Sequence, residues 1–351
     1  MSGPDMNGPG VSQQGMQGER PGRQAYTGVA TGRDQETRRR RGGRGEQPMV
    51  PDAKFRSYYG KPVINSPVWE APDIPGYLFL GGLAGGASLL GAGAQLTGRH
   101  ELSRVAKAGA FGAGVLSVVA LVHDLGRPER FLNMLRVFKP TSPMSVGSWL
   151  LAGYVPAAGV AAMSALTGRW RALGALATAG ATVMAPGVAS YTAALVSDTA
   201  VPAWHDGYPE MPFVFVGSGA TAAGGLGLAG APRAEAKPAR RLATFGVATE
   251  LGAAQWMEKR IGMAGEPYHQ GKGGLWMRVG KYLSVAGLAA SYLCYANTVV
   301  RKASGVALLA ASAATRFGIY YAGLASSDDP KYTVVPQRER LQRKAAEGAG
   351  G

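Results

Sequence analysis

The sequence has almost no cysteine and little histidine. Its 351 residues include one cysteine, Cys294, and four histidines. An internal disulfide needs two cysteines, and an iron–sulfur cluster needs several thiolates. A membrane cytochrome b needs histidine ligands inside helices, but His100, His205 and His269 fall in predicted loops and only His123 touches a helix end. We therefore expect no disulfide, no haem, no iron–sulfur cluster and no bound metal in this chain.

Long apolar stretches are missing from both ends of the chain. Residues 1–75 and 326–351 are polar and charged, whereas residues 76–325 consist of apolar blocks separated by short charged loops. No secretory signal is visible, because the first apolar run begins near Gly76. We predict that residues 1–50 form a disordered basic tail, that 51–75 form an extended segment on the membrane surface or on a partner, and that 326–351 form a polar C-terminal tail.

The net charge is +15, and 11 of the 37 Lys and Arg residues lie in residues 1–75, including the run Arg38 to Arg41. Such a tail can hold nucleic acid. Beside an apolar domain, a topological or membrane-surface role is favoured over nucleic acid.

The apolar blocks predict an all-α membrane protein. Because about 20 apolar residues cross a bilayer core, we expect eight transmembrane helices at 76–97, 105–123, 145–167, 172–196, 211–231, 240–261, 279–300 and 303–325. Cys294 would lie inside the seventh. The first block contains Gly81, Gly82, Gly85 and Gly86, two overlapping pairs of small residues that predict a close approach of neighbouring helices.

An even number of crossings places both termini on one side of the membrane. The three long loops, 124–144, 197–210 and 262–278, lie on that same side, and the loops on the other side are short. The basic tail predicts that termini and long loops face the cytoplasm of a bacterial cell. The elaborated side would also be the side that docks a partner.

His123 and Asp124 fall at the end of the second predicted helix. An imidazole and a carboxylate at that depth can hydrogen-bond a quinone head group and exchange protons with it. The alternative is that Asp124 caps the turn and pairs with Arg127 or Arg130.

The chain resembles the NrfD/polysulfide reductase family of membrane subunits. The resemblance rests on residues 77–86 (YLFLGGLAGG), on Asp124-Leu125-Gly126-Arg127-Pro128, on residues 130–133 (RFLN) and on residues 142–145 (SPMS), and it covers roughly residues 65–325.

This resemblance implies two four-helix bundles and a quinone- or menaquinone-binding anchor without haem. It also implies two partners: a ferredoxin-like subunit with four iron–sulfur clusters, and a molybdopterin catalytic subunit of the polysulfide, nitrite or formate-linked type. The chain would not be a complete enzyme alone. Tyr77, His123 and Asp124 would bind the quinone, and Arg127 would position the loop.

The loop 197–210 combines acidic, aromatic and proton-carrying residues. Asp198, Trp204, His205 and Asp206 are candidates for a quinone lid or a partner contact. The alternative is an ordinary interfacial loop with an aromatic belt.

Two ionisable residues fall inside predicted helices, Glu250 in the sixth and Arg316 in the eighth. Charges in a membrane face the protein interior and find partners. They form either a static ion pair or part of a proton path with Tyr191, to which Tyr154 and Lys281 would add. A charge on a broken helix also fits a secondary transporter or ion-coupled permease, the alternative function.

Overall fold

The structure is a computed structural model that describes residues 63–65, 67, 69–125 and 129–349. The predicted tail 1–50, most of the segment 51–75, and Arg127 lie outside these residues. The chain divides into two compact units, residues 66–327 and a second unit made of residues 1–65 with 328–351.

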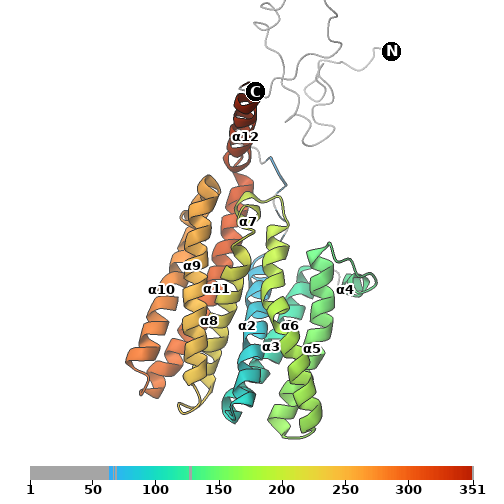
Figure 1. Ribbon diagram of the computed structural model, residues 1–351, viewed down its shortest axis with the longest axis vertical. Coiled ribbons are helices and arrows are strands. Elements are labelled where there is room, and N and C mark those ends of the chain that lie inside the picture. Colours follow the sequence, from blue (N-terminus) through green and yellow to red (C-terminus); the bar gives the residue numbers. More distant parts are fainter. Residues whose placement is uncertain (1–62, 66, 68, 126–128, 350–351) are drawn as a thin grey trace, which may run out of the picture. The chain divides into compact units, whose positions relative to one another are not determined.

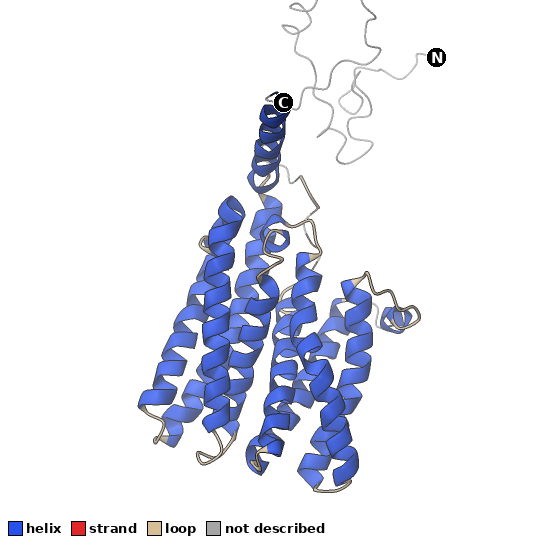
Figure 2. Ribbon diagram, viewed as in Figure 1, coloured by secondary structure: helices blue, strands red, loops and turns tan. Residues whose placement is uncertain are grey.

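Every regular element among the described residues is a helix (Figure 2). The long helices are α2 (Asp73–Leu96), α3 (His100–Asp124), α5 (Pro143–Thr167), α6 (Arg171–Ser197), α8 (Met211–Gly230), α9 (Lys237–Ile261), α10 (Gly271–Leu293) and α11 (Thr298–Asp328) (Figure 1). The second unit contributes α12 (Lys331–Ala349). Each of the eight predicted apolar segments therefore coincides largely with one helix.

Five of these helices are long and apolar enough to cross a membrane: α2, α3, α5, α6 and α8. The chain is thus an all-α, multi-pass membrane protein. The other three long helices of the membrane domain carry more charge. α9 and α11 hold Glu250 and Arg316 inside the protein, and α10 holds Arg278 and Lys281 beside a cavity described below.

Glycines bring α2 into close contact with two neighbours. A methyl group on Gly85 would lie 2.6 Å from the carbonyl oxygen of Ala185 in α6, and one on Gly86 would lie 2.6 Å from the carbonyl oxygen of Gly219 in α8. The predicted close approach is confirmed, and the two glycine pairs serve different helices. α2 consequently packs in the middle of the domain, between α6 and α8.

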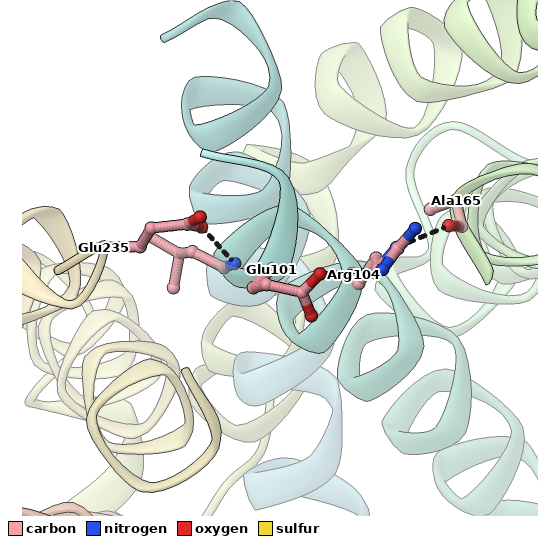
Figure 3. Close-up of polar contacts among 5 residues, drawn as sticks. Glu101, Arg104, Ala165 and Glu235 are labelled. Carbon is pink, nitrogen blue, oxygen red and sulfur yellow. Dashed lines mark hydrogen bonds and ion pairs between the residues drawn. The ribbon is translucent and has the colours of Figure 1, made fainter. Parts of the chain in front are cut away.

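The short loops at one end of the domain are tied together by polar contacts (Figure 3). Glu235, in the α8–α9 turn, accepts a hydrogen bond from the Leu102 amide at 2.9 Å and so satisfies a free N–H in the first turn of α3. Arg104 pairs with Glu101 at 2.7 Å and donates to the Ala165 carbonyl oxygen near the end of α5 at 3.2 Å (Figure 3). We call this end the short-loop end.

The predicted boundary between the last two membrane helices was wrong. The break lies at residues 294–297, not at 301–302, because the Asn297 side chain accepts hydrogen bonds from the amides of Val299 and Val300 (2.9 and 3.2 Å) and starts α11 there. Cys294 is therefore exposed at a helix end rather than inside a helix. Arg301 is buried, and it donates to the carbonyl oxygens of Leu228 and Ala231 at the end of α8.

The opposite end, which we call the long-loop end, contains short elements that hydropathy does not predict. Loop 124–144 includes α4 (Glu129–Met134), and loop 197–210 includes α7 (Pro202–His205). The predicted loop 262–278 is much shorter than expected: the 3₁₀ helix η2 (Gly262–Tyr268) follows α9 at once, and α10 begins at Gly271. Of residues 271–278, Met277 and Arg278 line a cavity described below, whereas Leu275 and Trp276 are exposed.

Candidate functional site

Tyr77 of α2 and Tyr191 of α6 meet in the core. Their hydroxyl groups are hydrogen-bonded, and the rings lie edge to face with centroids 6.4 Å apart. Both side chains are buried, and Ser117 of α3 donates to the Tyr77 carbonyl oxygen at 3.3 Å. A residue of the proposed proton path, Tyr191, thus contacts a residue of the proposed quinone site.

Gly147 of α5 leaves the space that the Tyr191 ring occupies. A methyl group built on Gly147 would overlap the ring at Cε2 and Cδ2. The Tyr191 ring can occupy this position only because residue 147 has no side chain.

His123 and Asp124 lie beside the first turn of α2. The His123 ring contacts Asp73 through Nδ1 at 2.6 Å from Oδ2, and the imidazole itself is largely exposed. Asp124 accepts a hydrogen bond from the Glu70 amide at 3.4 Å. Since Asp73 precedes Tyr77 by one helical turn, the ends of α2 and α3 bring a histidine and two carboxylates together above the Tyr77–Tyr191 pair.

The predicted alternative pairing of Asp124 involves residues whose side chains the structure does not describe. Arg127 lies outside the described residues, and so does the Arg130 side chain. The described partner of Asp124 is the backbone before α2. Asp73 was not predicted from the sequence, although its spacing of four residues from Tyr77 was the available signal.

Trp204 of α7 lies inside the protein. Its ring stacks on Trp69 with centroids 5.3 Å apart, and its indole N–H donates to the Ile319 carbonyl oxygen of α11 at 2.7 Å. The ring fills space above Gly323, where a methyl group would overlap it. Tyr320 donates to the Trp69 carbonyl oxygen at 2.6 Å. Trp204 therefore holds the segment before α2 against α11.

The other loop candidates are nearer to solvent. Asp198 and His205 are exposed, and His205 Nδ1 lies 3.2 Å from the Ser197 carbonyl oxygen. Asp206 offers its carbonyl oxygen to Arg260. The same guanidinium donates to both carboxylate oxygens of Glu210 (2.6 and 2.7 Å) and holds the pKa of that carboxyl below its usual value.

Glu250 lies at the inner end of a cavity of about 120 Å³ between α9, η2, α10 and α11. The cavity is also lined by Lys281 and, toward the long-loop end, by Glu258 and His269, whose Oε2 and Nε2 atoms lie 3.4 Å apart. Ionisable side chains around an intramembrane cavity are typical of ion or proton pathways. No local pattern in the sequence indicates that Glu258 and His269 lie together.

Arg316 occupies the centre of the domain. It donates to the Phe215 carbonyl oxygen of α8 at 2.8 Å, and its guanidinium carbon lies 3.7 Å from the centroid of the Phe215 ring. Its Nε and Nη1 have no hydrogen-bond partner among the described residues. A methyl group on Gly82 would lie 3.2 Å from Nη2, so Arg316 reaches α2 as well.

Glu250 and Arg316 do not form a direct ion pair among the described contacts. Glu250 is contacted by the Thr221 hydroxyl of α8 at 3.3 Å. Ser218, one turn from Thr221, is hydrogen-bonded to Ser312 of α11 at 2.8 Å. Ser312 precedes Arg316 by one helical turn, so a polar seam of α8 and α11 side chains lies near both charges.

Comparison with known proteins gives one family match. The model of the family described as polysulphide reductase, NrfD, matches residues 63–254. Among curated proteins, no match is found. The matched region contains the Tyr77–Tyr191 pair, His123, Asp124, α7 and Glu250, and it ends before α10 and α11.

Proposed function

The chain belongs to the polysulphide reductase NrfD family, whose members are membrane subunits of respiratory oxidoreductases, and from this we propose that it exchanges electrons between a membrane quinone and a docked iron–sulfur subunit. The single observation that supports this best is the cluster of His123, Asp73 and Asp124 at the edge of the membrane domain, beside Tyr77.

The cluster has the chemistry that a quinone head group needs. The contact with Asp73 engages His123 Nδ1 and leaves Nε2 of an exposed ring available to a ligand oxygen. The carboxylates beside the ring favour its protonated form, which donates to a carbonyl oxygen; the neutral ring accepts a proton from a hydroxyl. Tyr77 and Arg127 complete the proposed site, and a quinone such as menaquinone is the substrate.

The long-loop end is the proposed docking surface for the partners. Apolar side chains are exposed on α4 and on the segment after it: Leu132, Val137 and Phe138 are 58 to 69 % accessible. Exposed apolar patches rimmed by polar residues are typical of protein interfaces. We infer that a ferredoxin-like iron–sulfur subunit docks here, followed by a molybdopterin catalytic subunit. Asp198, His205 and Asp206 would contribute to this surface from loop 197–210, and the buried Trp204 would hold that loop in place.

We propose that all eight long helices of residues 76–325 cross a bacterial inner membrane, as two four-helix bundles, α2 to α6 and α8 to α11. α9 supports this, because Phe245 and Trp256 are exposed on its middle and Arg241 and Lys259 flank them, 18 residues or about 27 Å apart along the helix. Basic and aromatic residues at the two ends of an apolar surface are typical of a spanning helix. The polar tails 1–50 and 326–351 would lie in the cytoplasm, with 51–75 as the surface segment.

The cavity supports a proton path in the second bundle. The proposed path runs from the Glu258–His269 pair to Glu250, along the Ser218–Ser312 seam to Arg316, and on toward the Tyr77–Tyr191 pair. Arg316 supports it most directly, since unpartnered N–H groups buried in a protein are ordinarily satisfied by ordered water.

Purification of the protein from native membranes in a mild detergent tests this function. We expect iron–sulfur and molybdenum subunits and bound quinone to co-purify. In the purified complex, His123→Gln should lower quinol-dependent electron transfer at least tenfold, while His100→Gln at the short-loop end should leave it unchanged. A chain that purifies alone, without iron or quinone, would overturn the proposal. No observation on the described residues favours the transporter alternative.

A further inference from the structure

The short-loop end of the second bundle carries a group of basic residues that the proposed redox role does not use. We call this group the basic rim. It comes from two turns that touch each other, the α8–α9 turn and the α10–α11 turn, with the first residues of α9 and α11. Its members are Arg233, Lys237, Arg240, Arg241 and Lys302.

The rim is held in a defined geometry. The Arg240 guanidinium lies between two tyrosine rings, with its carbon 4.3 Å from the centroids of both Tyr292 and Tyr295, and it donates to the Ser291 carbonyl oxygen at 3.5 Å. Tyr295 donates to the Arg233 carbonyl oxygen at 2.7 Å, which fixes one turn on the other. The two turns and the Arg240 side chain are therefore held in a defined position.

The positive charge of the rim is not neutralised within the described residues. No ion pair there involves any rim residue, although Arg233, Lys237, Arg241 and Lys302 are exposed. The two acidic residues at this end have other partners: Glu235 accepts from the Leu102 amide, and Glu101 pairs with Arg104. An exposed, uncompensated cluster of cations attracts anions.

Apolar side chains lie one helical turn deeper on the same helices. Phe245 follows Arg241 by four residues on α9, and Val306 follows Lys302 by four residues on α11; both are 58 % accessible. Tyr292, about half exposed, adds an aromatic surface with a polar hydroxyl that bonds Thr244 at 2.9 Å. Cations above exposed apolar surface match a ligand with an anionic head and an acyl tail.

We propose that the basic rim is a binding site for an anionic phospholipid of the surrounding bilayer, with the lipid phosphate at Arg233, Lys237 and Arg241 and the acyl chains along Phe245 and Tyr292. A soluble anion would use only the charged half of this surface. The proposal concerns the second bundle and does not depend on the quinone site.

The test uses the full-length protein in detergent, titrated with phosphatidylglycerol, with phosphatidylcholine or with inorganic phosphate, and read by native mass spectrometry and by thermal unfolding. The double variant Arg233→Gln/Arg241→Gln is compared with Arg169→Gln/Arg171→Gln, which removes two exposed arginines from the same end of the first bundle. Arg240 stays unchanged because it packs between helices.

We expect phosphatidylglycerol adducts and a raised Tm for the unaltered protein and for the first-bundle variant, with the apparent affinity at least tenfold weaker in the rim variant. Phosphatidylcholine and inorganic phosphate should not reproduce the effect. Equal binding of both lipids, equal binding by both double variants, or full replacement by inorganic phosphate would each overturn the proposal.

Discussion

At the scale of single residues, Tyr191 depends on a neighbour that has no side chain. Gly147 lies against the ring, and the Tyr191 hydroxyl in turn meets Tyr77. A side chain introduced at residue 147 by substitution therefore displaces the Tyr191 ring but leaves both tyrosine hydroxyl groups in the protein. Such a variant separates the effect of ring position from the effect of a lost hydroxyl group.

Gly147→Ala should destabilise the protein by about 1–3 kcal/mol, because the added methyl overlaps the ring and forces it to shift. Thermal unfolding of the purified protein measures this. Gly112→Ala in α3 is the control, since nothing lies within 4 Å of a methyl group there. Equal melting temperatures for the two variants would contradict the packing of Tyr191.

The Glu210–Arg260 pair predicts a dependence of stability on pH. Because Arg260 lowers the pKa of Glu210 from its ordinary 4.5, the ionised carboxylate stabilises the fold above that value, and this contribution is lost as pH falls through the lower folded pKa. The unaltered protein should therefore melt above Glu210→Gln at pH 7, and the two curves should converge in acid. A difference that stays constant from pH 7 to pH 3 would show that the pair contributes no titrating interaction.

At the scale of elements, apolar length was enough to predict where the helices lie. It was not enough to place their ends, because ends are set by individual hydrogen bonds. The break between α10 and α11 was predicted at Arg301, since a basic residue in an apolar run suggests a loop. Asn297 caps α11 and so determines where the helix starts. Arg301 lies inside the protein because its guanidinium donates hydrogen bonds to carbonyl oxygens at the end of α8. Such a partner, about 70 residues away in sequence, cannot be predicted from local pattern.

The candidate site shows the same limit. The family resemblance suggested a common site for Tyr77, His123 and Asp124, but Asp73 and Glu70 become partners of His123 and Asp124 only when α2 and α3 lie side by side. Trp204 was a candidate lid residue because its loop combines acidic, aromatic and proton-carrying residues. Its ring is buried in space that the absence of a side chain at Gly323 leaves open, and local sequence does not predict this contact.

Asn297→Ala should destabilise the protein by about 0.5–2 kcal/mol through loss of the helix cap. Asn297→Asp should retain most of the stability, because a carboxylate accepts the same two amide hydrogen bonds. Thermal unfolding of both variants distinguishes the cap from a general loss of packing. If both fall equally, α11 does not start at this residue.

At the scale of the whole molecule, the exposed position of Cys294 offers a direct test of orientation. It is the one cysteine of the sequence, and it lies at the short-loop end, opposite the long loops. If the termini are cytoplasmic, this end faces the outside of the cell membrane. A membrane-impermeant maleimide should then label intact spheroplasts, and Cys294→Ser should abolish the labelling. Labelling only after the membrane is opened would place the termini and the partner surface outside.

The stack of Trp69 on Trp204 gives the molecule an intrinsic optical reporter. The centroids of the two indole rings lie 5.3 Å apart, and the Trp204 ring is buried. Because Trp69 belongs to the segment before α2, the stack depends on the position of that segment. That segment also holds the Asp124 side chain through Glu70. A ligand or a docked subunit that displaces this segment would separate the rings and shift their fluorescence, so that occupancy of the long-loop end can be followed by light in the unlabelled protein.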